Sequence, residues 1–308
     1  WIPGHYDPDL GLAYFGTGNP GPWIGDQRPG DNLYTNSVIA LDIETGNIKA
    51  HHQYHWNGSW DWDEVSTPIL MPVERAGRQF DALVHPGRNG YLWTLERQAD
   101  RIGFVDAEPY VYQNAFSGID PETGRPSYDP SHTPSTGESV DFCPSLWGGK
   151  DWPPAAYNPG TGLVYIPVNE NHCGVIEGRE VTYMPGSSYT GARTEFTLRD
   201  PQGNIGQIQA WDMDSGEEVW SVEFQSHNWG GILTTAGNLI FSGGTSDRFF
   251  RAHDALTGEE LWRFRTNSGI IGVPSTFSVD GKQYVAIQSG WGVDAAGMTA
   301  RIDQQRGT

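Results

Sequence analysis

Three oxygen-bearing side chains occur at positions where they could bind a cation. Asp61 and Asp63 are separated by one residue, and on a strand such side chains point to the same face, so both carboxylates can reach one ion. Asn19 lies in the Gly- and Pro-rich turn 16–23, where a side-chain amide oxygen can coordinate a hard cation. The simpler alternatives are that Asn19 only forms the turn and that Asp61 is an exposed turn residue.

The residues around these positions indicate what environment they could create. Trp60 and Trp62 flank Asp61, and two large apolar rings favour a dry site, in which the pKa of a carboxyl group rises. Arg88 stands in the tight turn 86–90. Its charge survives burial and could stabilise an oxyanion, although a solvated charge in a turn explains it equally well.

Lys150, Asp151 and the two cysteines allow more than one interpretation. A surface ion pair is the simplest explanation for Lys150 and Asp151. Cys143 and Cys173 can form one disulfide, remain free thiols or belong to a metal site, and no Cys-x-x-Cys pattern supports zinc or c-type haem. A disulfide would close a loop of ~30 residues and stabilise the fold by roughly 3 to 4 kcal/mol.

A repeated motif predicts the elements that hold these residues. The pattern Ala-x-Asp-x-x-(Thr/Ser)-Gly occurs at 40–46, 210–216 and 252–258. Asp can accept hydrogen bonds from its own turn and Gly supplies positive φ, so each copy is predicted to be a strand, a tight turn and a second strand. Trp220 and Trp262 follow the last two copies at the same distance, where a flat ring can pack between neighbouring sheets.

The spacing of the copies matches the size of a propeller blade. Asp212 and Asp254 are 42 residues apart, and Asp42 and Asp212 are 170 apart, which is about four such steps. A blade of four strands takes ~40 to 45 residues. A second class of segment, at 6–15, 157–166 and 235–241, predicts a short apolar strand after a turn. We therefore expect an all-β propeller without a long amphipathic helix, with a β-sandwich that reuses the same turns as the alternative.

Composition and charge fit a globular protein with many turns and exclude several partners. The chain has 40 Gly and 21 Pro together with 13 Trp, 13 Tyr and 12 Phe. Its net charge of −19 is unfavourable for binding nucleic acid or an anionic membrane. No apolar run reaches the ~18 residues of a spanning helix, and the N-terminus is no signal peptide, so any export signal is expected outside this sequence.

Several of these motifs resemble those of the methanol and ethanol dehydrogenase family of quinoproteins. The first are Trp1, the turn 16–23 with Arg28–Asn32 after it, and Trp60–Asp63. Matching motifs further along are His85–Gly90, Cys143–Ser145, Gly148–Asp151, Trp229–Gly231 and Ser268–Pro274. The resemblance implies an eight-bladed β-propeller, of which residues 1–308 are a partial domain corresponding to its second half. Because a propeller must close on itself, we expect the N-terminal blades to come from the same polypeptide or from a second chain.

The resemblance implies that Asn19, Asp61 and Asp63 are ligands of one metal ion. It also implies that Asp61 is the catalytic general base, which accepts the hydroxyl proton of an alcohol while hydride leaves the alcohol carbon. Many calcium-dependent members have a small or neutral residue where Asp63 stands, whereas an additional Asp is similar to the lanthanide-dependent branch. A further carboxylate favours a trivalent ion electrostatically, so a lanthanide is expected, with Ca²⁺ as the alternative.

Other residues are implied to contact the cofactor, pyrroloquinoline quinone (PQQ). Trp1 matches the tryptophan beneath the quinone plane, and Arg88 matches a catalytic arginine near the quinone oxygens. The remaining implied contacts are Lys150 and Asp151 at the cofactor rim and Trp229 with Gly230 at its wall. Cys143 and Cys173 match a disulfide of the family. Its glutamate metal ligand and vicinal disulfide belong to the N-terminal half of the propeller.

The implied reaction is the oxidation of an alcohol to an aldehyde or ketone by hydride transfer to metal-bound PQQ. A c-type cytochrome is the implied electron acceptor, and the periplasm is the implied location. Two alternatives stand beside this function. One is a PQQ-dependent sugar or polyol dehydrogenase, which would share nearly all of these residues. The other is a propeller without catalytic activity that acts as a scaffold.

Overall fold

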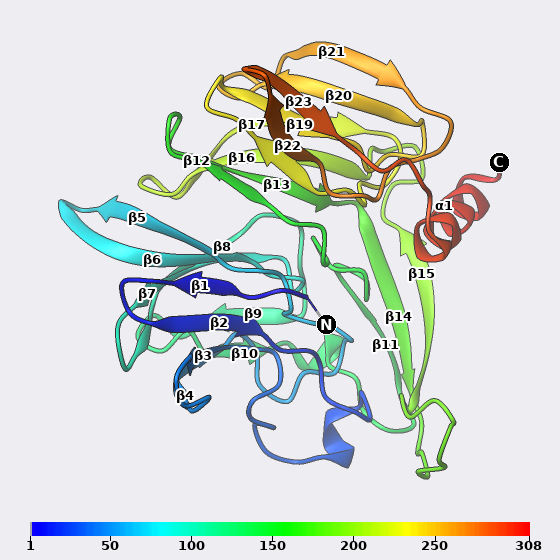
Figure 1. The fold of residues 1–308 in the computed structure, drawn as a ribbon. Helices are drawn as coiled ribbons and strands as arrows, with labels where there is room; N and C mark the ends of the chain where they lie inside the picture. Colours follow the sequence, from blue (N-terminus) through cyan, green and yellow to red (C-terminus); the bar gives the residue numbers. More distant parts are fainter. Residues whose placement is uncertain (1) are drawn as a thin grey trace. The chain divides into compact units, whose positions relative to one another are not determined.

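The computed structural model describes residues 2–308, which form two compact units. Unit 1 contains the described residues up to Val73 together with Gly77–Trp152 and His172–Arg199. Unit 2 contains Glu74–Ala76, Pro153–Asn171 and Asp200–Thr308. Each unit is built mainly from antiparallel sheets, as the strand arrows in Figure 1 show.

Two sheets of unit 1 have four strands each, and in both of them every strand pairs with the one before it in the sequence. The first consists of β1 (His5–Asp7), β2 (Leu12–Gly16), β3 (Ser37–Asp42) and β4 (Ile48–Gln53). The second consists of β5 (Ile69–Arg75), β6 (Arg78–Pro86), β7 (Tyr91–Arg97) and β8 (Ile102–Pro109). This up-and-down order of four strands is the order within one propeller blade.

Smaller elements of unit 1 follow these two sheets or interrupt their loops. A hairpin is formed by β9 (Phe116–Ile119) and β10 (Pro126–Tyr128), and a three-stranded sheet by β11 (Ser139–Phe142), β14 (His172–Gly178) and β15 (Ala192–Leu198). Two short 3₁₀ helices are η1 (Gly25–Gln27) and η2 (Pro130–His132).

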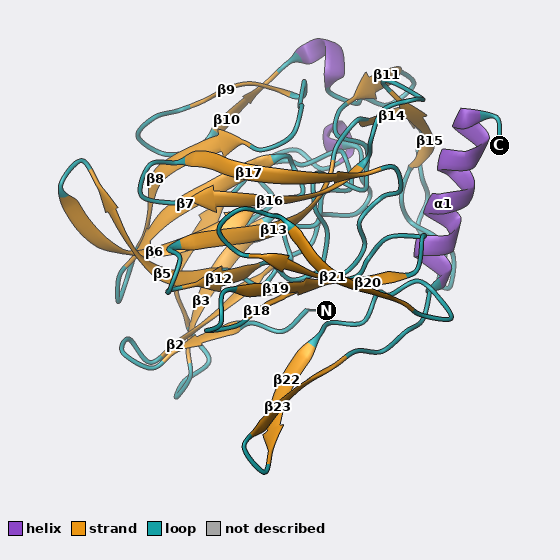
Figure 2. Cartoon of the chain, turned by 90° about the horizontal axis from the view of Figure 1, so that it is seen from above, coloured by secondary structure: helices purple, strands orange, loops and turns teal. Residues whose placement is uncertain are grey.

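Unit 2 repeats the four-stranded pattern. One sheet consists of β12 (Ala156–Asn158), β13 (Leu163–Asn169), β16 (Gly206–Asp212) and β17 (Glu217–Phe224). The next consists of β18 (Ile232–Thr234), β19 (Leu239–Ser242), β20 (Phe249–Asp254) and β21 (Glu260–Arg265). The hairpin of β22 (Ser275–Val279) and β23 (Lys282–Ala286) and the helix α1 (Val293–Arg306) follow; Figure 2 distinguishes α1 from the strands by colour.

As predicted, each copy of the repeated motif forms a strand, a tight turn and a second strand. The structure adds that this turn lies between the third and fourth strands of its sheet. In the first copy, Asp42 Oδ1 accepts hydrogen bonds from the backbone N–H groups of Glu44 and Thr45, at 3.0 and 2.8 Å. Gly46 has a φ of 72°. The strand before this turn has a bulge after Ala40, and equivalent bulges follow Ala210 and Ala252. The alanine therefore marks the residue where the strand bends into its turn.

Two expectations about spacing and helices are wrong. The 170 residues between Asp42 and Asp212 contain one complete four-stranded sheet, β5–β8, and not several equal steps, because the hairpin β9–β10 and the three-stranded sheet β11–β14–β15 lengthen the interval. The helix α1 was not expected. It buries Ala295, Met298 and Ile302, whose spacing of three and four residues forms one apolar stripe.

Aromatic packing differs between two equivalent tryptophans of unit 2. Trp220 on β17 packs on Tyr165 with ring centroids 5.8 Å apart, and its Nε1–H donates to Ala255 O in the next sheet at 3.2 Å. This confirms that the ring lies between neighbouring sheets. Trp262 on β21 is 49% exposed. Among residues 2–308, none of the helices has the length and apolar character needed to cross a membrane.

Candidate active site

Asp61 and Asp63 lie in the irregular segment between β4 and β5. No strand is assigned there, and Asp61 has a φ of 61°, in the left-handed region. The expectation that strand alternation brings the two carboxylates together is therefore wrong. They are nevertheless close enough for the charge of Asp63 to contribute to a raised pKa of Asp61. Both side chains are only partly buried, so they remain accessible to a ligand.

Asn19 contacts both aspartates, Asp63 through its backbone and Asp61 through its side chain. Its backbone N–H donates to Asp63 Oδ1 at 2.7 Å, and its side chain forms a hydrogen bond with Asp61. Gly18 makes this approach feasible, because a Cβ at that position would lie 2.7 Å from Asp63 Oδ1. The structure thus brings together all three residues that the sequence suggested as cation ligands.

Arg28 holds the loop that carries Asn19 in place. Its guanidinium donates to the backbone carbonyls of Pro22, Trp23 and Gly58 and to Asn32 Oδ1. These bonds tie the loop after β2 to the segment that leads into Asp61. The residues Arg28–Asn32, which resemble a family motif, therefore have a structural role in fixing this loop.

Arg88 lies among the carboxylates. Its Nη1 is 3.3 Å from Asp63 Oδ2 and 3.4 Å from Asp151 Oδ1, and its Nε donates to Leu146 O at 2.8 Å. The side chain is 8% exposed. The alternative of a solvated turn charge is therefore wrong. A buried, permanently charged guanidinium can stabilise negative charge that develops next to it.

The pKa of Asp61 is raised to about 7. Burial is the largest cause, and the negative charges of Asp63 and Asp151 act in the same direction, whereas Arg88 and the hydrogen bond with Asn19 act against it. A carboxyl group with such a pKa exchanges protons near neutral pH, which suits a general base.

Lys150 and Asp151 are buried beside Arg88. Lys150 is 1% exposed and its Nζ donates to Ser66 Oγ at 2.7 Å and to the backbone carbonyl of Asp151 at 2.8 Å. The simple explanation of a surface ion pair is therefore wrong. Burial lowers the pKa of Lys150 to about 7, and burial raises the pKa of Asp151.

The disulfide between Cys143 and Cys173 is formed, which confirms the expected pairing. Cys143 begins the loop that leads to Lys150 and Asp151. The indole N–H of Trp62 donates to Ser145 O in the same loop at 3.0 Å. The disulfide and Trp62 therefore hold this loop to β14 and to the segment of Asp61.

Glu64 is a buried residue of the site that the sequence did not reveal. It is fully buried, and its Oε2 lies 2.8 Å from His85 Nε2. Burial works to raise the pKa of Glu64, but the hydrogen bond and charge of His85 and the charge of His55 hold it below its ordinary value. The carboxylate directly follows Asp63, but its hydrogen-bond partner His85 is 21 residues away in sequence, which is why no local motif identified it.

The other predicted cofactor contacts are Trp1, Trp229 and Gly230. Trp1 falls outside the described residues. Trp229 and Gly230 belong to unit 2, where Trp229 is 5% exposed and its backbone N–H donates to Gly244 O at 2.8 Å. A Cβ on Gly230 would lie 2.8 Å from the Cα of Gly244, so glycine allows two backbones to meet there.

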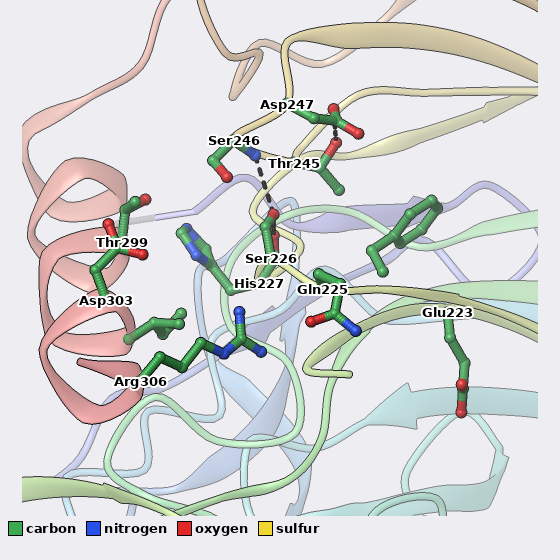
Figure 3. A pocket seen from close by; sticks show the side chains of 12 residues that line it. Glu223, Gln225, Ser226, His227, Thr245, Ser246, Asp247, Thr299, Asp303 and Arg306 are labelled. Atoms are coloured by element: carbon green, nitrogen blue, oxygen red, sulfur yellow. Dashed lines mark hydrogen bonds between the residues drawn. The ribbon is translucent and has the colours of Figure 1, made fainter. Parts of the chain in front are cut away.

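A cavity of about 350 Å³ in unit 2 contains none of the predicted residues. Thr299, Asp303 and Arg306 of α1 line one side and His227 and Asp247 contribute from loops, as Figure 3 shows. Arg306 donates to the backbone carbonyls of Pro201 and Gly203 at 2.9 and 2.8 Å, and so anchors the end of α1. Asp247 is already bonded to Thr245. We therefore place the candidate site in unit 1.

The donor groups of unit 1 fit part of a hard cation site. Within residues 2–308, no group of three or more His, Cys, Asp and Glu is arranged to hold a metal ion. Asn19, Asp61 and Asp63 offer one amide and two carboxylates, fewer than the about six oxygens that Ca²⁺ requires. Asp151 Oδ1 is buried and accepts no hydrogen bond within the described part of the chain. A cation would relieve this excess of negative charge.

Comparison with known proteins gives one family and several relatives. The family model for the glucose/ethanol/alcohol dehydrogenase β-propeller domain (PQQ) matches residues 1–101 and 221–285. Quinoprotein alcohol dehydrogenase PedH of Pseudomonas putida is 40% identical over 300 residues, which are 95% of this chain and 49% of that protein. A lanthanide-dependent methanol dehydrogenase of Methylacidiphilum fumariolicum is 40% identical over 294 residues, which are 93% of this chain and 47% of that protein.

Solved structures agree with this result. A europium-containing methanol dehydrogenase superposes with a TM-score of 0.88 at 37% identity, and the match covers 98% of this chain and 54% of that one. The chain spans about half the length of the relatives it matches.

Proposed function

The chain belongs to the PQQ family of glucose, ethanol and alcohol dehydrogenase β-propeller domains, and we propose that it supplies the general base and cation ligands of an alcohol dehydrogenase. The observation that carries this proposal is the cluster of Asn19, Asp61 and Asp63 around a buried Arg88. A carboxyl group whose pKa is strongly raised by burial and by neighbouring carboxylates is a candidate for a functional site.

In the proposed reaction Asp61 accepts the proton of the alcohol hydroxyl. Its pKa of about 7 means that it can take up a proton and release it again near neutral pH. Trp60 and Trp62, which flank Asp61 in the sequence, are each 1% exposed, and burial of Asp61 itself is the largest cause of its raised pKa. Arg88 supplies a fixed positive charge next to the developing negative charge. PQQ would supply the hydride acceptor for oxidation of the alcohol to an aldehyde or ketone, and the cation would supply Lewis-acid chemistry.

We propose that Asn19, Asp61 and Asp63 hold a hard cation, and that this cation is a lanthanide in preference to Ca²⁺. Two carboxylates in direct contact with the ion favour the higher charge. Relatives named as lanthanide-dependent and europium-containing methanol dehydrogenases support the same choice. We propose that Lys150 and Asp151 contact the rim of PQQ. That Trp229 and Gly230 of unit 2 form a wall for the cofactor stays a prediction.

The complete enzyme requires more of the propeller. The exposed apolar side chains of β21, Trp262 at 49% and Phe264 at 59%, fit coverage by a further blade. We propose that the remaining blades come from the same polypeptide or a second chain and carry the missing ligands. A c-type cytochrome would take up the electrons, and the enzyme would act in the periplasm.

The test of this function is metal-dependent activity in an Asp63→Ala variant of the assembled enzyme. Dye reduction with a series of alcohols and sugars is measured after loading with PQQ and either La³⁺ or Ca²⁺. We expect the variant to lose La³⁺-dependent turnover by about 10- to 100-fold while Ca²⁺-dependent turnover persists. Equal effects on both ions would remove the lanthanide assignment. If the wild-type protein showed neither quinone absorbance nor turnover, the proposed dehydrogenase activity would be refuted. The substrate profile distinguishes alcohol oxidation from sugar oxidation.

A further inference from the structure

Glu64 connects the segment of Asp63 to the loop that carries Arg88. Its Oε2 accepts the backbone N–H of Arg88 at 3.0 Å, and its Oε1 accepts the backbone N–H of Asn89 at 3.1 Å. A carboxylate that accepts two adjacent backbone N–H groups fixes the position and the orientation of that loop. Because Glu64 is fully buried, water does not compete for these bonds.

Two histidines lie next to the same carboxylate. His85 Nε2 lies 2.8 Å from Oε2, and His55 Nδ1 lies 3.6 Å from Oε1. The ring of His85 is stacked on Tyr54, with centroids 4.3 Å apart. Glu64 therefore cannot shift without disturbing several buried groups, so it is a rigid support for the loop.

The loop that carries Arg88 also contacts the proposed cation ligand Asp63. The Arg88 side chain reaches Asp63 Oδ2 and Asp151 Oδ1, at 3.3 and 3.4 Å. Arg88 is thus bound to two consecutive residues: its backbone N–H donates to Glu64, and its guanidinium contacts Asp63. A shift of the loop would move the guanidinium away from both carboxylates.

We propose that Glu64 is a positioning residue of the active site, which fixes the Arg88 loop so that the guanidinium lies between Asp63 and Asp151. This inference rests on the proposed function, because it assigns Glu64 a role in the same reaction. The packing around the loop supports it. A Cβ on Gly87 would lie 3.1 Å from Glu64 Oε2 and 2.7 Å from Asn89 Oδ1, so the loop and the carboxylate are closely fitted.

The first test is amide hydrogen exchange in Glu64→Gln, followed by mass spectrometry on peptides that cover the loop 87–90. The oxygen of glutamine can accept only one of the two N–H bonds, because its amide nitrogen faces the other as a donor. We expect exchange in this loop to become about tenfold faster, with strand β7 unchanged. Gly87→Ala, which crowds the same carboxylate from the loop side and leaves its charge intact, should have the same effect.

Asp7→Asn is the matched control. Asp7 is 2% exposed, accepts the backbone N–H groups of Asp9 and Leu10 at 3.0 and 3.3 Å, and pairs with Arg97. It is therefore a buried carboxylate of unit 1 with similar bonds, but it has no contact with the site. It should reduce thermal stability without changing exchange in the loop 87–90.

The second test is steady-state turnover of the assembled, loaded enzyme. Glu64→Gln should lower kcat at least tenfold with KM for the alcohol within about threefold, whereas Asp7→Asn should leave both unchanged. When Arg88→Lys is already present, adding Glu64→Gln should lower kcat by less than about twofold further, because both changes disturb the same interaction.

These results separate the two proposals. Unchanged exchange in both Glu64→Gln and Gly87→Ala, or turnover equal to that of Asp7→Asn, would overturn the role of Glu64 while leaving the enzyme function intact. A further tenfold loss in the Arg88→Lys background would show that Glu64 acts by another route and would also overturn it. Inactive wild-type protein would instead refute the proposed function.

Discussion

Arg88 of unit 1 and Arg251 of unit 2 are both buried among carboxylates, but the balance of charge around them differs. Arg251 is 5% exposed and pairs with Asp247 and Glu260. Burial works to raise the pKa of Asp247, but hydrogen bonds from Arg251 and Thr245 hold it below its ordinary value. The acid in unit 2 is thus more stable as an anion than it would be in water.

Around Arg88 the opposite holds. Burial raises the pKa of both Asp61 and Asp151, although Arg88 acts against the rise in each case. One guanidinium does not compensate three neighbouring carboxylates. Where the acids beside a buried arginine have lowered pKa values, the ion pair has a structural role. Where the pKa values of the acids stay raised in spite of the arginine, the cluster is a candidate site for binding a cation or a proton.

The largest expected effect comes from replacing one acid beside each arginine, Asp61 in unit 1 and Asp247 in unit 2. Asp61→Asn should lower alcohol turnover of the assembled enzyme by about 10²- to 10⁴-fold, because the general base is removed while the shape of the side chain is kept. Asp247→Asn is the counterpart in unit 2 and should leave turnover within about twofold. Dye-coupled assays at saturating alcohol measure both variants, and equal losses would contradict the distinction.

A smaller effect appears in the pH dependence of stability. The pKa of Asp61 rises from 3.8 to about 7 on folding, so the folded state binds the proton more tightly and stability falls as the pH rises between these values. Relative to wild type, Asp61→Asn should gain on the order of 2 kcal/mol of unfolding free energy between pH 5 and pH 8. Urea denaturation of the metal-free protein at both pH values measures this gain.

Asp247→Asn supplies the contrasting result in the same experiment. Its pKa is lowered on folding, so its stabilising effect is lost only as the pH falls through its folded pKa, below the ordinary value of 3.8. The loss of stability in this variant should therefore be similar at pH 5 and pH 8. If Asp61→Asn behaved in the same way, Asp61 would not be a destabilised acid.

Local features of the fold could be predicted from the sequence because they depend on a few neighbouring residues. The turns of the Asp-x-x-(Thr/Ser)-Gly copies are made by side-chain and backbone bonds within four residues, and these were found. The number of sheets between Asp42 and Asp212 was wrong, because inserted strands change the spacing without leaving a periodic signal.

The site divides in the same way. Motifs identified Asn19, Asp61 and Asp63, and the resemblance to a family gave them a common purpose. The left-handed backbone of Asp61 has no sequence signal, because only a few per cent of non-glycine residues have a positive φ and no glycine marks the position. The burial of Lys150 was missed because a lysine next to an aspartate is usually solvated, and its partner Ser66 is 84 residues away.

The central claim is that Asn19, Asp61 and Asp63 converge on one hard cation. Titration of the metal-free protein with Tb³⁺, with emission excited through the neighbouring Trp60 and Trp62, tests it directly. The account predicts saturation at one ion per molecule and affinity at least tenfold weaker in Asp61→Asn and in Asp63→Asn, with Asp247→Asn unchanged. Equal affinity in wild type and in both unit 1 variants would contradict it.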